Sequence, residues 1–156
     1  MISYAEALQK VLETVSPLDP VEKALAGAAG CVLAAPAIAQ WDMPRSNNSA
    51  MDGFAISGAA GKAETDFSII GSAYAGQPFP GRIMPGQAVR ITTGATLPDG
   101  ADTVVPSEDV LAENDHILVT TTPKAGQHVR CRGEEFCKGD ILADRGTTLH
   151  LSLIHI

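Results

Sequence analysis

Glycine and proline recur every few residues between positions 58 and 123, and this spacing limits what the middle of the chain can fold into. The apolar runs between these residues have the length of β-strands, and none of them continues into a helical periodicity. Four such runs cover residues 67–70, 88–91, 103–106 and 117–121. Short strands joined by tight turns predict a small β barrel or sandwich for the middle of the chain.

A helix is expected near the N-terminus, over residues 3–14. Ser3 and Glu6 have the spacing of a capping box, in which each side chain accepts a hydrogen bond from the other residue's backbone N–H. Apolar residues then follow at three- and four-residue steps, which is the spacing of one helix face. They are Ala5, Leu8, Val11, Leu12 and Val15. Pro17 ends the pattern.

Two turn-forming segments divide the chain. Residues 40–48 are polar and contain a proline, and a second turn cluster covers residues 123–126. These boundaries predict an α+β, β-rich fold with two lobes. A β domain of residues 43–123 is expected as an insertion into an α/β lobe made from both chain ends, residues 1–42 and 124–156.

The charge and the apolar runs argue against two kinds of partner. The net charge is −7 and the pI is about 4.9, which argues against a nucleic-acid-binding surface. No apolar stretch approaches the roughly 18 residues that a membrane span needs, and Met1 is not followed by a signal-peptide pattern. We therefore expect a cytoplasmic protein without a nucleic-acid or membrane partner.

The cysteines indicate a reducing compartment. Cys31, Cys131 and Cys137 are an odd number without a closely spaced pair, which does not suit a disulfide framework. His128 could join the last two in a zinc site, but the spacing matches no common zinc-binding motif. We therefore expect free thiols.

The first segment that could carry chemistry is N-N-S-A-M-D-G-F-A at residues 47–55, the Asp52 motif. Asp52 lies in an expected turn among Asn and Ser side chains, and Gly53 would let the backbone come close to a ligand. A carboxylate held in this way can bind a hard cation or act as a base. The alternative is an Asx-rich helix cap without chemistry.

The second segment, residues 90–102, is the Thr93 motif, which runs from an expected strand into a turn rich in hydroxyl groups and glycine. Successive backbone N–H groups in such a turn can form a concave site for an oxyanion, and the Thr93 hydroxyl would add a donor. The alternative is a plain β-turn.

The third segment is R-C-R-G-E-E at residues 130–135, the Arg130 motif. Arg130 and Arg132 occupy alternate positions, so in an extended segment they would point to the same face and could hold an oxyanion. Glu134 and Glu135 would offer carboxylates to a nearby cation. The alternative is a salt-bridged surface strand.

Taken together in this order, the three motifs resemble those of the molybdopterin molybdenumtransferases, the MoeA family that includes the gephyrin E domain. S-A-M-D-G-F-A at residues 49–55 is similar to the family signature S-A-M-D-G-[YF]-A. R-I-T-T-G-A at residues 90–95 and R-x-R-G-E at residues 130–134 resemble the second and third family blocks. The resemblance extends from residue 3 to about residue 149.

The resemblance implies a transferase that catalyses the last step of molybdenum cofactor biosynthesis. Molybdate is inserted into the dithiolene of adenylylated molybdopterin, and AMP is released with the help of a divalent cation, usually Mg²⁺. The family also implies a homodimer, with the first lobe as the expected contact region. Both substrates are anions, so an acidic protein needs local arginines and backbone donors to hold them.

Carried over to this sequence, the resemblance implies Asp52 as the main catalytic carboxylate and metal ligand, and Thr93 as the hydroxyl at the oxyanion site. Glu135 is a further catalytic candidate. The family usually has aspartate there, and the additional methylene moves the carboxylate by roughly 1 Å. The residues expected to contact substrate or anion are Ser49, Arg90, Gly94, Arg130, Arg132 and Gly133.

The family chain continues beyond residue 149 into a doubly wound α/β domain that binds the pterin nucleotide, whereas residues 150–156 do not resemble that continuation. One expectation is therefore an enzyme fragment that is inactive without the nucleotide-binding domain. The other is a non-catalytic dimerisation or scaffold module of the gephyrin-like type. A third reading is a sugar- or cofactor-binding β domain unrelated to molybdenum.

Overall fold

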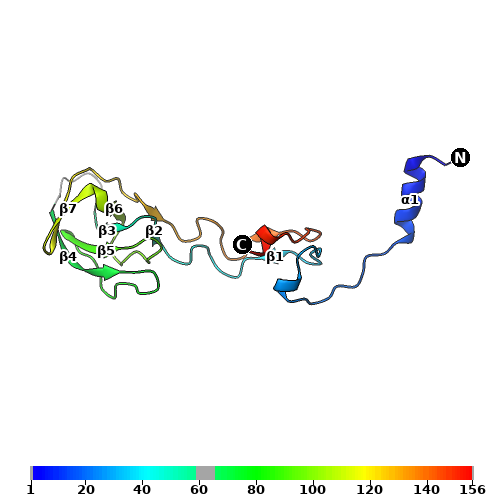
Figure 1. Cartoon of the computed structure of the whole chain (residues 1–156), viewed down its shortest axis with the longest axis horizontal. Helices are drawn as coiled ribbons and strands as arrows, with labels where there is room; N and C mark the ends of the chain where they lie inside the picture. Colours follow the sequence, from blue (N-terminus) through cyan, green and yellow to red (C-terminus); the bar gives the residue numbers. More distant parts are fainter. Residues whose placement is uncertain (1, 59–65, 156) are drawn as a thin grey trace. The chain divides into compact units, whose positions relative to one another are not determined.

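A computed structural model of the chain describes residues 2–58 and 66–155 (Figure 1). Contacts group the chain into two compact units, a central unit of Ile38–Asp140 and a terminal unit of Met1–Ala37 with Ile141–Ile156. The lobe boundaries expected from the sequence, at 42/43 and 123/124, differ from these unit boundaries and stay a prediction. Every candidate site residue lies in the central unit.

A curled six-stranded sheet forms the body of the central unit (Figure 1). Its strands, in spatial order, are β6 (Thr103–Pro106), β3 (Gly53–Ile56), β5 (Gln87–Ile91), β4 (Asp66–Ala73), β8 (His116–Val119) and β7 (Val110–Glu113). Neighbouring strands are antiparallel, except for the parallel pair β4 and β5. The expected β-rich α+β fold with a small barrel or sandwich domain is confirmed, and four strands overlap the four expected runs.

Two strands of this sheet, β3 and β7, are not indicated by the sequence pattern. β3 lies inside the Asp52 motif, where Gly53 and its polar neighbours indicate a turn. All four of its residues are buried, because β5 and β6 pair with it on both sides. β7 is an edge strand with mostly exposed residues, so it has no alternating apolar pattern by which it could be recognised.

The sheet has a buried cluster on each face, because successive residues of a strand point to opposite sides. Phe54 of β3 packs in one cluster with Val105 of β6. Ala55, the next residue of β3, packs in the other cluster with Val89 of β5. β3 is therefore fixed from both faces, which also fixes the position of the adjacent Asp52.

The terminal unit begins with α1 (Tyr4–Thr14), which confirms the predicted helix. Its capping box is formed, since Ser3 N donates to Glu6 Oε2 at 2.7 Å and Glu6 N donates to Ser3 Oγ at 3.3 Å. Within the described chain α1 buries none of its residues. The other elements are η1 (Leu25–Gly27), β10 (Ile141–Ala143) and α2 (Leu151–Ile154). β1 (Ala37–Ile38), which pairs with β10, begins at Ala37, where the first segment of this unit ends. No helix within residues 2–58 and 66–155 has the length and apolar character needed to cross a membrane.

Candidate functional site

The three motifs meet at β2 (Asn48–Ser49), which belongs to the Asp52 motif. β2 pairs with β9 (Val129–Arg130), so that Asn48 lies opposite Arg130. On the Thr93 motif, Gly94 N donates to Ser49 O and Ser49 N donates to Ala95 O, both at 2.9 Å. The first motif therefore lies between the other two, although more than 25 residues separate each motif from the next in the sequence.

A pocket of about 180 Å³ opens where the motifs meet. It is lined by Pro44, Asn48, Ser49, Ala50, Thr93, Gly94 and Arg130. Each of the three motifs contributes to this lining. Four of the lining residues, namely Ser49, Thr93, Gly94 and Arg130, are candidates from the sequence, whereas Pro44, Asn48 and Ala50 are not. Asn48 and Ala50 lie inside the Asp52 motif, so their place in the sequence could have indicated them.

Asp52 is bonded to the Thr93 motif next to this pocket. Its Oδ1 accepts hydrogen bonds from Thr93 N at 2.7 Å and from Thr93 Oγ1 at 2.9 Å. Its backbone carbonyl accepts from Ser107 N at 3.1 Å, at the start of η2 (Ser107–Asp109). These bonds to the carboxylate, first from the Thr93 backbone and then from its hydroxyl, lower the pKa of Asp52 below its ordinary value of 3.8. Asp52 is therefore ionised at neutral pH.

The hydrogen bonds of Thr93 and its neighbours also revise one expectation. The N–H groups of Thr93, Gly94 and Ala50 all donate within the protein, to Asp52, Ser49 and His128 respectively. These backbone groups are thus not arranged as a free nest for an oxyanion, because the close approach of the three motifs uses them. Among residues 2–58 and 66–155, no donor bonds to Asp52 Oδ2, which leaves that oxygen open to a ligand.

We expect a carboxyl titration to place the pKa of Asp52 below 3.8, because its hydrogen bonds favour the ionised form. The stabilisation that these bonds give the fold is fully present above pH 3.8 and is lost as the pH falls through the lowered pKa. Thr93→Val should raise the pKa of Asp52 toward 3.8 without reaching it, since the backbone N–H of residue 93 still donates to the carboxylate. Carbon-detected NMR of the side-chain carboxyl measures both values. A wild-type pKa at or above 3.8 contradicts the geometry.

The two arginines of the third motif have different partners. β9 ends at Arg130, so Arg132 lies beyond the strand. Arg130 lines the pocket, and its Nη2 donates to Glu135 Oε1. Arg132 instead donates from Nε to Asp42 Oδ2 at 2.6 Å. Each arginine therefore has its own carboxylate partner, as in the alternative of a salt-bridged surface segment.

The contacts of two further candidates, Arg90 and Gly133, explain their positions in the fold. Arg90 lies on β5 with its guanidinium carbon 5.2 Å from the centre of the Phe54 ring, and it does not line the pocket. Gly133 adopts a φ of 72° and donates from its N–H to Pro44 O at 3.0 Å. A side chain at Gly133 would also lie 2.9 Å from Cys137 Sγ, so this position needs glycine for the turn.

A divalent cation fits only one part of the site. Within the described residues, no group of three or more His, Cys, Asp or Glu side chains could hold a metal ion. Cys31, Cys131 and Cys137 are free thiols. Mg²⁺ is commonly held by one or two carboxylates together with substrate phosphates and water. The open oxygen of Asp52 suits that kind of binding, whereas a site built from protein ligands alone does not fit.

Comparisons with known proteins agree over the length of the chain. The family model described as "MoeA N-terminal region (domain I and II)" matches residues 2–156. The chain is 34% identical over 151 residues to a molybdopterin molybdenumtransferase of Haemophilus influenzae, covering 96% of this chain and 37% of the relative. It is 31% identical over 160 residues to one of Staphylococcus epidermidis, covering 99% and 38%.

A solved structure shows the same fold. The crystal structure of a molybdopterin biosynthesis moeA protein from Pyrococcus horikoshii OT3 superposes with a TM-score of 0.91 at 29% identity, covering 99% of this chain and 42% of that one. The chain therefore spans well under half the length of the relatives that it matches.

Proposed function

Because the chain belongs to the family of MoeA N-terminal regions, we propose that it forms the anion-holding part of a molybdopterin molybdenumtransferase. The proposed reaction is the insertion of molybdate into adenylylated molybdopterin with release of AMP. The observation that carries the proposal is the pocket lined by all three motifs, next to an ionised carboxylate with one open oxygen. Residues 1–156 would contribute this pocket, and the rest of the enzyme would bind the nucleotide.

Each side chain of the pocket has a role in this proposal. Arg130 would attract the anionic substrate, since a guanidinium binds phosphate-like oxygens well and lines the pocket here. Thr93 would hold Asp52 in one orientation through its two hydrogen bonds. Glu135, which pairs with Arg130, would limit the directions in which that guanidinium can point.

Asp52 and the substrate are both negative, so they repel each other at neutral pH. A bound Mg²⁺ would supply the positive charge that joins the Asp52 carboxylate to a phosphate oxygen. Asp52 would then orient the adenylylated substrate through its open oxygen while Thr93 keeps the other oxygen engaged. The preorganised carboxylate is the contribution of this chain, because the Thr93 N–H and hydroxyl both donate to one of its oxygens.

A second candidate is a dimerisation module without catalysis. The observation that favours it is the apolar face of α1, where Leu8, Val11 and Leu12 are each more than 40% exposed. A surface of this kind is typical of a protein contact. The homodimer expected from the family would use it in either function, so exposure alone does not separate the two.

A chimera separates the two candidates. This chain would replace the matching region of the Haemophilus influenzae relative, and molybdenum insertion from adenylylated molybdopterin would be measured. The chain alone should be inactive and the chimera should be active, because the chimera joins the pocket to a nucleotide-binding domain. A folded chimera without activity contradicts the enzyme proposal and favours the dimerisation module.

A further inference from the structure

The loop that follows Arg130 is attached along its length to the segment that precedes β2. Residues 131–140 run beside residues 39–47, and six backbone hydrogen bonds join them, two of which are Ala39 N to Asp140 O at 2.9 Å and Phe136 N to Met43 O at 3.4 Å. The other four are Met43 N to Phe136 O at 2.8 Å, Glu135 N to Met43 O at 2.9 Å, Gly133 N to Pro44 O at 3.0 Å and Gly139 N to Ala39 O at 2.9 Å. The position of the Arg130 loop therefore depends on a segment about 90 residues earlier in the chain.

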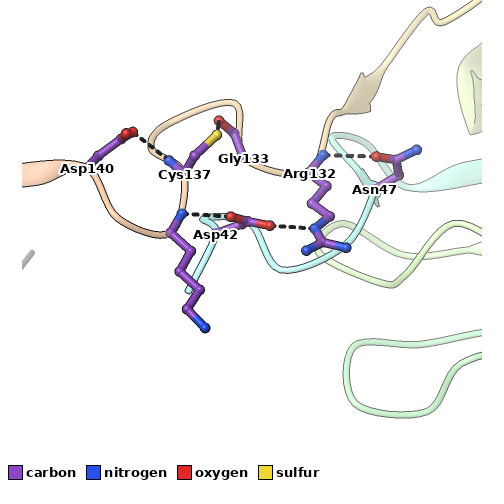
Figure 2. Close-up of polar contacts among 7 residues, drawn as sticks. Asp42, Asn47, Arg132, Gly133, Cys137 and Asp140 are labelled. Atoms are coloured by element: carbon purple, nitrogen blue, oxygen red, sulfur yellow. Dashed lines mark hydrogen bonds and ion pairs between the residues drawn. The ribbon is translucent and has the colours of Figure 1, made fainter. Parts of the chain in front are cut away.

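Asp42 joins the two ends of this loop with one side chain. Its Oδ2 accepts from Arg132 Nε at 2.6 Å, and its Oδ1 accepts from Lys138 N at 2.7 Å. The side chain is only 16% exposed, whereas that of Arg132 is 67% exposed. Figure 2 shows Asp42 bonded to Arg132 and facing the turn that carries Gly133. Both oxygens are in use, so Asp42 has little capacity left for a ligand.

Asn47 holds the same arginine from the other side. Its Oδ1 accepts from Arg132 N at 2.9 Å (Figure 2). Arg132 is thus fixed by its backbone to the Asp52 motif and by its side chain to Asp42. Arg130, two residues earlier, is left to line the pocket together with Thr93 and Gly94.

We propose that Asp42 and Arg132 form a clasp, a pair of positioning residues that hold the loop so that Arg130 faces the pocket. The inference rests on the proposed function and assigns Arg132 a role different from the one expected from the sequence. Arg130 is then the arginine of the motif that meets the anion, and Arg132 acts on it through the loop.

The clasp and a direct ligand role for Arg132 predict opposite effects of Asp42→Asn. Asparagine keeps the shape of the side chain and an acceptor for Lys138 N, but it removes the charge that holds the guanidinium. If Arg132 were a substrate ligand restrained by Asp42, its release would tighten anion binding. If it is a clasp, the loop loosens and anion binding weakens.

Pyrophosphate titration of the whole chain tests this by calorimetry in wild type, Asp42→Asn, Arg132→Ala and the double variant. Each single variant should weaken binding roughly 3- to 30-fold, and the double variant should be no weaker than the weaker-binding single variant, since both remove one contact. Asp115→Asn, in the turn between β7 and β8, is the matched charge control and should bind as wild type does. Tighter binding by Asp42→Asn, or fully additive losses, overturns the proposal.

Amide hydrogen exchange provides a readout that does not need a ligand. In Asp42→Asn and Arg132→Ala, the amides of Gly133 and Glu135 should exchange at least several-fold faster, whereas the amide of Ala55 in β3 should not change. If wild type binds no pyrophosphate, the proposed pocket function fails, and exchange still decides the clasp. Unchanged protection of Gly133 and Glu135 in both variants would then overturn it.

Discussion

Asp52→Asn is expected to lower molybdenum insertion by the chimera about 10²- to 10³-fold, the effect of removing one preorganised charged group from an active site. The substitution is nearly isosteric, and an asparagine Oδ1 can still accept from both donors of Thr93. The NH2 group of the amide then replaces the open carboxylate oxygen, and this group cannot bind a cation. A loss of activity therefore reports the charge of Asp52 and not its packing.

Two controls limit the interpretation of this result. Asp115→Asn removes the same charge at a remote turn and should keep the activity of the unmodified chimera. Thr93→Val should cause a smaller loss than Asp52→Asn, because the Thr93 N–H continues to hold the carboxylate. Activity of Asp52→Asn within threefold of the unmodified chimera would show that Asp52 is not part of the reaction.

Gly53→Ala is expected to destabilise the central unit by more than about 4 kcal/mol, a size reached when a substitution cannot be accommodated. A Cβ at this position would collide with the carbonyl oxygen of Val105 and lie 2.9 Å from the Cα of Pro106. Both atoms belong to the backbone of β6, which pairs with β3 through residue 53. Relief would need the two strands to separate, because no flexible side chain is available to move.

Urea unfolding followed by circular dichroism measures this effect, with Gly76→Ala as the control. Gly76 has a φ of 81° but open space around it, so an alanine there should cost only about 1–2 kcal/mol for the left-handed backbone. The midpoint of Gly53→Ala should lie well below that of the control. Equal midpoints for the two variants would show that β3 and β6 are not as closely paired as described.

Local signals in the sequence predicted much of the fold. The Ser3 and Glu6 spacing indicated a helix cap because both bonds lie within one turn, and the structure forms both. The runs that became β4, β5, β6 and β8 were bounded by turn residues, so their positions could be read directly, although β4 extends three residues beyond the expected run. β3 could not be found in this way, because the small and polar residues next to it in the sequence are typical of a turn. It is a strand because it pairs with β5 and β6.

Gly53 shows why the site was harder to predict than the fold. Glycine in the Asp52 motif was expected to let a ligand approach the backbone, but the backbone that approaches it is β6. The sequence pointed to Gly53 and Thr93 as candidates, but it did not show which neighbouring residues they contact. Thr93 is similar, since its hydroxyl was expected to face an oxyanion and donates to Asp52 instead.

No sequence pattern indicated that Asp42 and Arg132 form an ion pair. Asp42 lies in a polar segment that indicates only a boundary, and its two donors come from residues 132 and 138. Contacts over such a separation depend on how the strands are paired, which spacing and composition do not specify. The family resemblance pointed to three motifs that line one pocket, whereas the partner of each side chain within them came from the structure.

The central claim is that the three motifs form one pocket that holds an anion. Titration of the ¹⁵N-labelled chain with pyrophosphate in the presence of Mg²⁺ tests it most directly. We expect saturable shifts at the amides of Ala50 and Gly94 and at the Arg130 side chain, and Arg130→Ala should abolish them. No saturable shift, or shifts confined to the separate hollow of about 270 Å³ beside His116 and Glu113, would contradict the claim.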